Sequence, residues 1–229
     1  MQNDYSGLLL VNKPSGITSF KLVNLIKKKL QVKKAGHCGT LDPLASGLML
    51  VLIGKATKLQ DKFMKQDKVY TASVKLGTKT DSGDLAGKVV QQSDYSHVDI
   101  DKIKNVCKDF IGETEQIPPM FSALKVGGKK LYELARKGIE IERKKRKITI
   151  YFIDVIDYSG GIIKMKVKCS SGTYIRTLAE DIGEKLSTHA VLENLVREEI
   201  GIYSLKNALS LEEINNAAKE TVAEKIIEV

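Results

Sequence analysis

The chain has 229 residues, of which 42% are hydrophobic and 28% are charged. These proportions are typical of ordinary globular domains and exclude a disordered or fibrous chain. The longest unbroken apolar run, Leu48–Ile53, has six residues, whereas a helix that spans a bilayer needs about 20. Because the N-terminus also lacks the basic and apolar segments of a secretion signal, the sequence predicts neither membrane insertion nor secretion.

The charge balance is strongly basic. Lysine and arginine number 37 against 28 for aspartate and glutamate, which gives a net charge of +9. A charge of this sign favours a polyanionic partner, although it does not separate RNA, DNA and anionic lipid. The three cysteines are scattered and form no C-x-x-C pair, so the sequence predicts neither a disulfide framework nor a zinc site. We expect a reducing cytoplasm as the location and no metal ion.

The N-terminal quarter predicts a strand, a turn and a helix. Leu8–Val11 has the length and composition of a short buried strand, and the Asn12–Gly16 segment ends it. Thr18 or Ser19 is then placed to cap a helix. The apolar residues that we expect on its buried face recur at helical spacing, and they are Phe20, Val23, Ile26 and Leu30.

The remaining elements alternate between strands and helices. Leu48–Ile53 lies between two glycines and predicts a buried strand, and Val69–Leu76 predicts another. We expect a hairpin of Ile148–Val155 and Ile162–Cys169, and a helix over Tyr174–Leu186. The overall prediction is a mixed α/β (α+β) domain with mostly antiparallel pairing.

The C-terminal segment begins with a capping box. Ser210 is followed three residues later by Glu213, the spacing at which a serine and a glutamate cap one helix start together. We expect an amphipathic helix there and a further helical stretch that ends the chain at Val229.

A glycine-rich loop, Gly36–Gly47, contains the strongest chemical signal. Its three glycines permit close backbone approach, and Pro43 favours an extended backbone at Asp42, which would project the carboxylate out of the loop. An aspartate before proline in such a segment is most often a turn residue that binds its own backbone. The residues alone therefore leave a catalytic and a structural role for Asp42 open, and His37 has the same two alternatives.

Five ordered motifs resemble those of the TruB family of tRNA pseudouridine synthases. They lie between about Leu8 and Leu195 and include the loop itself. The matching segments are Leu10-Val11-Asn12-Lys13-Pro14-x-Gly16, Gly36-His37-x-Gly39-Thr40-Leu41-Asp42-Pro43-x-Ala45-Ser46-Gly47, Lys68-Val69-Tyr70 with Leu76-Gly77, Gln116 to Lys125 continuing to Gly138, and Gly172-Thr173-Tyr174-Ile175-Arg176-Thr177-Leu178.

The resemblance implies a function, a fold and a catalytic residue. Members of this family isomerise one uridine, position 55 in the T-loop of tRNA, and they consume no cofactor. The implied fold is the pseudouridine synthase fold, a mostly antiparallel mixed sheet flanked by helices, with an insertion that grips RNA. The catalytic aspartate corresponds to Asp42, which acts either as a nucleophile at the sugar or base or as a base that opens a glycal route.

The resemblance also assigns the residues around the target base. Arg176 corresponds to the arginine that orients the aspartate. We also expect it in the first turn of a helix capped by Thr173, where the helix dipole disfavours a cation and so suggests a specific anionic partner. Tyr70, which has a role in proton transfer at C5, and Tyr174 correspond to tyrosines that contact the flipped uracil. His37 and Leu195 correspond to further residues that contact the nucleotide.

Basic clusters supply candidates for contacts with the RNA backbone. Extrusion of a base from its stack costs a few kcal/mol, which contacts elsewhere must offset. Such clusters are usually solvated faces, but the net charge favours phosphate contacts for two of them. These candidates are Lys125, Lys129, Lys130, Arg143, Lys144, Lys145 and Arg146.

We expect residues 1–229 to form a single catalytic domain in which the C-terminal RNA-binding module common in bacterial members is absent or vestigial. After Leu195 the family commonly has an arginine-rich segment, whereas this chain has Val196-Arg197-Glu198-Glu199, and the two acidic residues weaken the case for phosphate contacts there. The expected partner is tRNA, with no membrane, no required protein partner and a monomeric state.

Two alternatives stay open. A non-catalytic RNA-binding module or tRNA-folding chaperone would need the basic clusters but not the aspartate. An enzyme of the same family that acts on another RNA would keep the chemistry and change the substrate.

Overall fold

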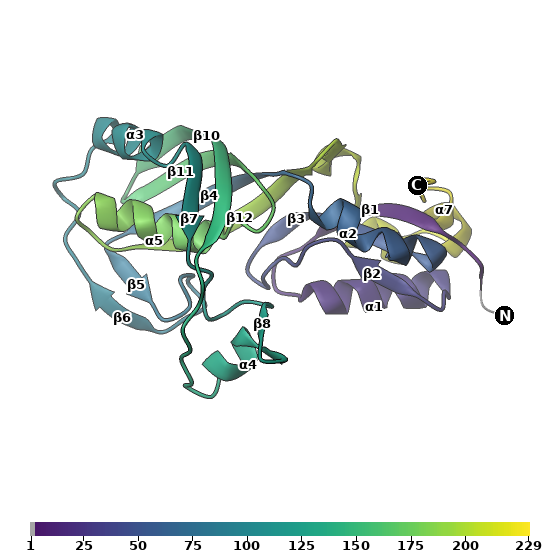
Figure 1. Cartoon of the computed structure of the whole chain (residues 1–229). Coiled ribbons are helices and arrows are strands. Elements are labelled where there is room, and N and C mark those ends of the chain that lie inside the picture. The colour runs from purple at the N-terminus through teal and green to yellow at the C-terminus, as the bar shows by residue number, and fades with distance from the viewer. Residues whose placement is uncertain (1–2) are drawn as a thin grey trace. The chain divides into compact units, whose positions relative to one another are not determined.

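The computed structural model describes residues 3–229 and divides into two compact units. Unit 1 contains the residues up to Tyr70 together with Leu195–Val229, and unit 2 contains Thr71–Asn194. Each unit combines strands and helices (Figure 1). Two strands, β4 (Lys68–Leu76) and β12 (Ala190–Ile200), have residues in both units. Each unit is described separately below.

Unit 1 is built around β3, which pairs antiparallel with β1 along its whole length. At its start β3 pairs in parallel with β12, and at its end it pairs with β2. The loop of residues 38–45 joins β2 to β3. The elements of unit 1, besides parts of β4 and β12, are β1 (Gly7–Lys13), α1 (Ser19–Leu30), β2 (Ala35–His37), β3 (Ser46–Ile53), η1 (Gly54–Leu59), α2 (Gln60–Met64), β13 (Tyr203–Ser204), η2 (Leu205–Asn207), β14 (Leu209–Ser210), α6 (Leu211–Asn216) and α7 (Lys219–Ala223).

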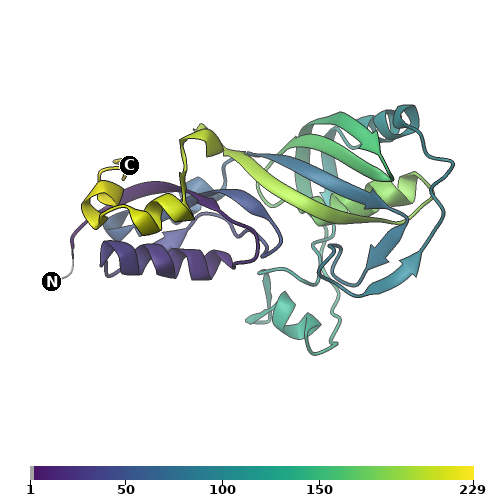
Figure 2. The ribbon, with the colours of Figure 1, turned by 180° about the vertical axis from the view of Figure 1, so that it is seen from behind.

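The helix α1 begins where the sequence predicts but buries a different face. The Thr18 side chain accepts a hydrogen bond from the Lys21 backbone N–H at 3.1 Å and so caps the helix. The expectation that Phe20 lies in the core is wrong, because its side chain is 72% exposed. Leu22 is buried instead, and together with Val23 it belongs to the apolar face that α1 turns towards the core. The helices α1, α6 and α7 lie side by side (Figure 2).

The C-terminal segment confirms the capping box and corrects the helix that was expected to end the chain. The Ser210 hydroxyl accepts from the Glu213 N–H, and the Glu213 carboxylate accepts from the Ser210 N–H. The last helix, α7, ends at Ala223 instead of Val229. The following residues turn back, and Ile227 forms an antiparallel bridge with Leu8 of β1. This pairing satisfies backbone groups that a continued helix would leave at the end of β1.

Unit 2 contains the strand order β12-β4-β11-β10-β7. The predicted hairpin is present, although β10 is longer than expected. The hairpin turn consists of Gly160 and Gly161, which have φ angles of 58° and 78°. A two-residue hairpin turn of type I′ requires positive φ at both of its central residues. Besides parts of β4 and β12, its elements are β5 (Thr78–Thr80), β6 (Val89–Gln92), α3 (Ile100–Lys108), β7 (Gly112–Gln116), β8 (Lys125–Val126), β9 (Lys129–Lys130), α4 (Leu131–Ala135), β10 (Arg146–Ser159), β11 (Ile162–Cys169) and α5 (Ile175–Lys185).

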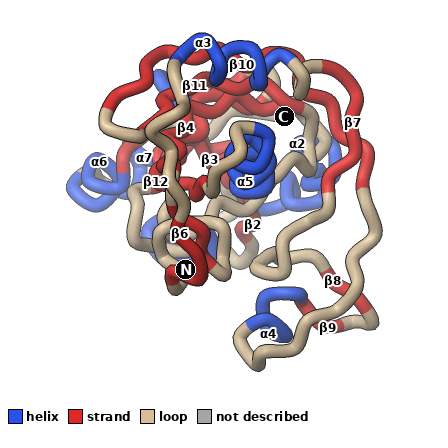
Figure 3. Tube along the Cα trace, turned by 90° about the vertical axis from the view of Figure 1, so that its left-hand side faces the viewer, coloured by secondary structure: helices blue, strands red, loops and turns tan. Residues whose placement is uncertain are grey.

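Between β7 and β10 the chain forms a small separate hairpin and helix. The elements β8, β9 and α4 lie apart from the sheet of unit 2 in Figures 1 and 3. They coincide with the segment predicted to be an RNA-gripping insertion. The sheets elsewhere are mostly antiparallel, with parallel pairs at β1–β14 and β3–β12, so the predicted fold class is confirmed. Within residues 3–229 no helix is both long and apolar enough to cross a membrane.

Candidate active site

The loop that contains Asp42 is fastened to the start of α1. The Ser19 hydroxyl accepts from the Leu41 N–H and donates to the Leu41 carbonyl oxygen, each at 2.9 Å. The Gly16 N–H donates to the Pro43 carbonyl at 2.8 Å. Asp42 itself is half-buried and lies between these attachments. The loop is therefore fixed on both sides of the carboxylate, as a catalytic group requires.

A buried arginine holds the other side of the same loop. Arg197 of β12 is 1% exposed, and its guanidinium donates to the carbonyl oxygens of Gly39 (3.1 Å) and Leu48 (2.8 Å). A Cβ at Gly47, where φ is +108°, would lie 2.4 Å from the Arg197 carbonyl oxygen. The loop glycines were predicted to permit close backbone approach, and Gly47 does so here by packing directly against the backbone of β12.

Three charged groups of unit 1 interact around this loop. Lys13, a fully buried residue of β1, donates through Nζ to the carbonyl oxygens of Pro14 and Ile17, each at 2.9 Å. Burial lowers the pKa of Lys13 to about 8, the Asp42 carboxylate opposes this change, and Arg197 adds to it. The Asp42 carboxylate thus interacts with the buried Lys13 cation, and a neighbouring cation favours the ionised form of a carboxylate, which either proposed role requires.

His37 and Cys38 stay uncharged in this environment. Burial, and next the Arg197 charge, lower the pKa of His37, so the imidazole is neutral at pH 7. Its Nδ1 is buried without a hydrogen-bond partner in the described residues. Burial raises the pKa of Cys38 to about 11. Cys38 is therefore a protonated, fully buried thiol at neutral pH.

The residues predicted to contact the base are divided between the two units. Tyr70 in β4 and Leu195 in β12 are buried and belong to unit 1 together with His37 and Asp42. Tyr174 is half-buried and belongs to unit 2. Its backbone is held by the Gln116 side chain, which accepts from the Tyr174 N–H at 2.8 Å and donates to its carbonyl at 3.1 Å.

Arg176 also belongs to unit 2 and is 5% exposed. Its Nη1 donates to the Ser82 carbonyl at 2.8 Å and lies 3.7 Å from Oδ2 of Asp84, while Nη2 donates to the Phe121 carbonyl at 2.6 Å. Asp84 is thus an anionic neighbour of Arg176. These contacts fix the guanidinium plane, as orientation of another carboxylate would need.

The expectation that Thr173 caps this helix is wrong. The N-cap of α5 is Tyr174, and the Thr173 hydroxyl donates to the Ser170 carbonyl at 3.0 Å instead. Arg176 still lies in the first turn. The Gln116 side chain holds the backbone at this helix start through its two hydrogen bonds to Tyr174.

The candidates for backbone contacts differ in exposure. Lys129, Lys144, Lys145 and Arg146 are exposed, and Lys130 is half-exposed with its Nζ 5.4 Å from the Tyr132 ring centroid. Arg143 is half-buried, donates to the Pro118 carbonyl at 3.2 Å and pairs with Glu140 at 3.1 Å. The Lys125 side chain lies outside the described residues. Arg143 therefore also has a structural role.

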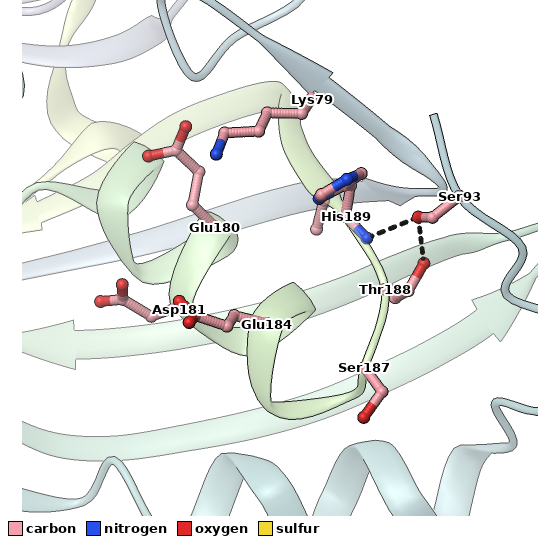
Figure 4. A pocket seen from close by; sticks show the side chains of 9 residues that line it. Lys79, Ser93, Glu180, Asp181, Glu184, Ser187, Thr188 and His189 are labelled. Atoms are coloured by element: carbon pink, nitrogen blue, oxygen red, sulfur yellow. Dashed lines mark hydrogen bonds between the residues drawn. The ribbon is translucent and has the colours of Figure 1, made fainter. Parts of the chain in front are cut away.

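A hollow of about 550 Å³ in unit 2 has the wrong charge for RNA. Glu180, Asp181 and Glu184 of α5 line it, with Lys79 opposite Glu180 (Figure 4). Burial, and next Glu184, raise the pKa of Asp181 to about 6. Its acidic lining would repel phosphate, and none of the predicted site residues lines it. In the part of the chain that is described, no cluster of three metal-binding side chains occurs.

Comparison with known proteins decides the family. Residues 27–175 match the TruB family pseudouridylate synthase (N terminal domain). The chain is 57% identical to a tRNA pseudouridine synthase B of Endomicrobium trichonymphae over 95% of this chain and 94% of that protein. A protein of the same name from Clostridium tetani is 46% identical over 97% of this chain and 76% of that protein. The chain belongs to the TruB family. The predicted enzyme class, an isomerase that forms pseudouridine, is confirmed.

Solved structures agree with this family and fold. A chain in a Cbf5-Nop10-Gar1 complex superposes with a TM-score of 0.75 at 29% identity, covering 97% of this chain and 60% of that one. A chain of an H/ACA RNP bound to a substrate RNA containing 2'-deoxyuridine superposes with a TM-score of 0.72 at 26% identity, covering 100% of this chain and 65% of that one. This TruB-family chain thus spans about three fifths of the first and two thirds of the second.

Several residues of this TruB-family site were missed by sequence reasoning. Lys13 was quoted only as part of a motif, and Arg197 only as a weak candidate for phosphate contact. Asp84 had no local signal, because its partner lies 92 residues away in the chain. Gln116 was part of a family motif, but its contact with Tyr174, 58 residues away, had no local signal. A charged residue soon after an apolar run, as Lys13 is at the end of β1, is the one available clue.

Replacement of Arg197 by methionine is expected to loosen the Asp42 loop. Methionine fills a similar volume but removes both donors, and misplacement of a catalytic group by 1 Å can cost about 100-fold in rate. We expect kcat for pseudouridine formation to fall by about 10- to 100-fold with RNA affinity nearly unchanged. The pKa of His37, followed by NMR, should rise because the Arg197 cation lowers it.

The matched control is Lys225→Met, which removes an exposed cation from unit 1. It should change neither kcat nor the pKa of His37. An Arg197→Met enzyme with native kcat would contradict the proposed clamp.

Proposed function

We propose that the chain converts the uridine at position 55, in the T-loop of tRNA, to pseudouridine, with Asp42 as the catalytic carboxylate. The observation that supports this most is the fixed loop that holds Asp42, with the buried Lys13 cation interacting with its carboxylate, in a segment whose sequence matches the family. We also propose that both units act together as one catalytic domain, because the proposed catalytic residues are divided between them.

The reaction needs no net oxidation or reduction and consumes no co-substrate. The N1–C1′ bond of the nucleotide breaks, the uracil rotates and a C5–C1′ bond forms. The C5 proton leaves to solvent and N1 gains a proton. Asp42 acts as a nucleophile at the sugar or base, or as a base that removes a sugar proton to open a glycal route. Both routes begin with an ionised Asp42.

The other residues take supporting roles in this proposal. Arg176, held by Asp84 and two carbonyl oxygens, orients and stabilises the Asp42 carboxylate during the reaction. Tyr70 stacks on the extruded uracil and takes part in proton transfer at C5. Tyr174 and Leu195 bound the same base, and the neutral imidazole of His37 contacts the nucleotide through hydrogen bonds and not through charge.

The names of the relatives support tRNA as the substrate, because the proteins of Endomicrobium trichonymphae and Clostridium tetani are both tRNA pseudouridine synthases. We propose that β8, β9, α4 and the basic residues that follow them contact the phosphate backbone of the T-arm. Lys144, Lys145 and Arg146 are exposed, and a solvated cation can reach a phosphate. Lys145 also lies 3.9 Å from the Glu115 carboxylate, which a phosphate would have to displace. The proposed setting is the cytoplasm.

A steep salt dependence of RNA binding is the expected consequence. Each neutralised phosphate contributes a slope of about −0.7 to −0.9 to log K against log salt. We expect a slope steeper than about −3 for the native chain and a slope about 2 shallower for the triple variant Lys144→Gln, Lys145→Gln, Arg146→Gln. The matched control converts exposed lysines of α3, Lys102, Lys104 and Lys108, to glutamine. A native slope equal to one or two phosphate contacts would refute this surface.

The experiment that tests the function uses a T-arm hairpin with tritium at uracil C5. We expect the native chain to release the label from the target uridine, and no such release when cytidine replaces that uridine. Tight binding of the hairpin without release would favour a non-catalytic RNA-binding module. Release only from an RNA other than tRNA, found by sequencing RNA that copurifies with the chain, would favour a different substrate.

A further inference from the structure

An exposed aromatic side chain lies beside the Asp42 loop. Phe20 is the second residue of α1, and 72% of its side chain is exposed. Leu22 follows two residues later on the buried face, and two residues correspond to about 200° of rotation around an α-helix. Phe20 thus contributes little to the core, and its exposure costs apolar hydration that packing does not offset.

The position of Phe20 relative to Asp42 is fixed by backbone attachments. Phe20 follows Ser19, and Asp42 follows Leu41, and the Ser19 hydroxyl binds both backbone groups of Leu41 at 2.9 Å. Summing these bonds with the spacing of consecutive Cα atoms limits the distance between the Cα atoms of Phe20 and Asp42 to about 15 Å. Only one or two nucleotides of an extended strand fit within that distance.

The surroundings of Phe20 favour RNA over a protein partner. Lys21, the next residue, and Asn24, one turn further along α1, are both exposed and are cationic and polar, respectively. The helix α1 has no acidic residue and four lysines. A protein interface would require a wider apolar patch, whereas an exposed aromatic ring on a lysine-containing helix is the kind of group on which unpaired bases stack.

We propose that Phe20 is a base-stacking residue of the substrate site, and that an unpaired nucleobase of the RNA adjacent to the target uridine stacks on its ring. This inference rests on the proposed function for the identity of the RNA. Phe20 would hold the RNA strand at the start of α1, beside the Asp42 loop. It increases affinity and takes no part in the bond rearrangement.

The absence of tryptophan from the chain provides a direct probe. The variant Phe20→Trp contains a single tryptophan, whose fluorescence is quenched when a base stacks on it. We expect saturable quenching on addition of the T-arm hairpin and none with a stem duplex that lacks the loop. The matched control is Ile202→Trp, which places the reporter at a 90% exposed position of unit 1, and we expect no quenching there.

A kinetic comparison tests the consequence. Loss of one stacked base weakens RNA binding by about 5- to 100-fold, so Phe20→Ala should raise KM for the hairpin by that factor with kcat nearly unchanged. Phe20→Trp should restore KM, and Ile202→Ala should resemble the native chain. Thermal melting checks that each variant is folded.

Absence of quenching in Phe20→Trp, or a native KM in Phe20→Ala, would overturn the proposal. Fluorescence reports stacking without turnover, and tritium release reports chemistry. Quenching without any release by the native chain would therefore refute the proposed function and retain the stacking site, whereas release without quenching would do the reverse.

Discussion

Asp42→Asn is expected to abolish pseudouridine formation while RNA binding persists. The substitution keeps the size of the side chain but removes the negative charge, so the residue can act neither as a nucleophile nor as a base. Removal of such a group typically lowers kcat by at least about 1,000-fold. The measurement is single-turnover tritium release from the T-arm hairpin, with the dissociation constant determined in parallel.

The control for this variant is Asp61→Asn, which neutralises an exposed carboxylate of α2 in the same unit. It should release tritium at the native rate. If Asp42→Asn turned over at a rate close to native, Asp42 would be the turn residue that its sequence context alone allows.

The second large effect is expected for Arg176→Lys. Lysine retains the positive charge but lacks the planar fork that binds Ser82, Asp84 and Phe121 together. We expect kcat to fall by about 100-fold, because the cation no longer has a fixed orientation, and KM for the hairpin to stay within a few-fold of native.

A separate measurement distinguishes this effect from misfolding. The melting temperature of Arg176→Lys should fall by only several degrees, because the charge opposite Asp84 is kept while hydrogen bonds to carbonyl oxygens are lost. A matched Lys185→Arg change, at an exposed ion pair with Asp109 near the end of the same helix, should alter nothing. If the Arg176→Lys enzyme had a native kcat, the reaction would require only a positive charge at this position and not the geometry of the guanidinium group.

Buried charge is the feature that joins these predictions. Lys13 and Arg197 are among the largest fully buried side chains of the structure, and burial of a cation is costly unless polar groups surround it. Here those groups are carbonyl oxygens next to the Asp42 loop. Burial of these cations lowers the stability of the fold, and in return it fixes the loop that holds the Asp42 carboxylate.

Local sequence patterns predicted the elements whose determinants are local. The apolar run at β3, the glycine turn between β10 and β11 and the capping box at Ser210 each act within a few residues, and each is present. The predicted buried face of α1 wrongly included Phe20. The helical spacing of Val23, Ile26 and Leu30 does not decide which residue of the first turn lies on the same face, so the sequence pattern alone could not exclude Phe20.

Features that depend on distant contacts were not predictable. Tyr174 replaces Thr173 as the N-cap because Gln116 of β7 binds it, and the chain end leaves its helix because Ile227 pairs with Leu8. The role of Arg197 depends on a loop about 150 residues away along the chain. The family motifs assigned candidate site residues one by one, but they did not predict the hydrogen bonds that hold those residues in place.

The most direct test of the proposed activity is to map pseudouridine in a full-length tRNA transcript after incubation with the native chain or with Asp42→Asn. We predict one pseudouridine, at position 55 in the T-loop, in the native reaction and none in the variant. An unmodified transcript in the native reaction, or a modified T-loop in the Asp42→Asn reaction, would contradict the assignment of this activity to Asp42.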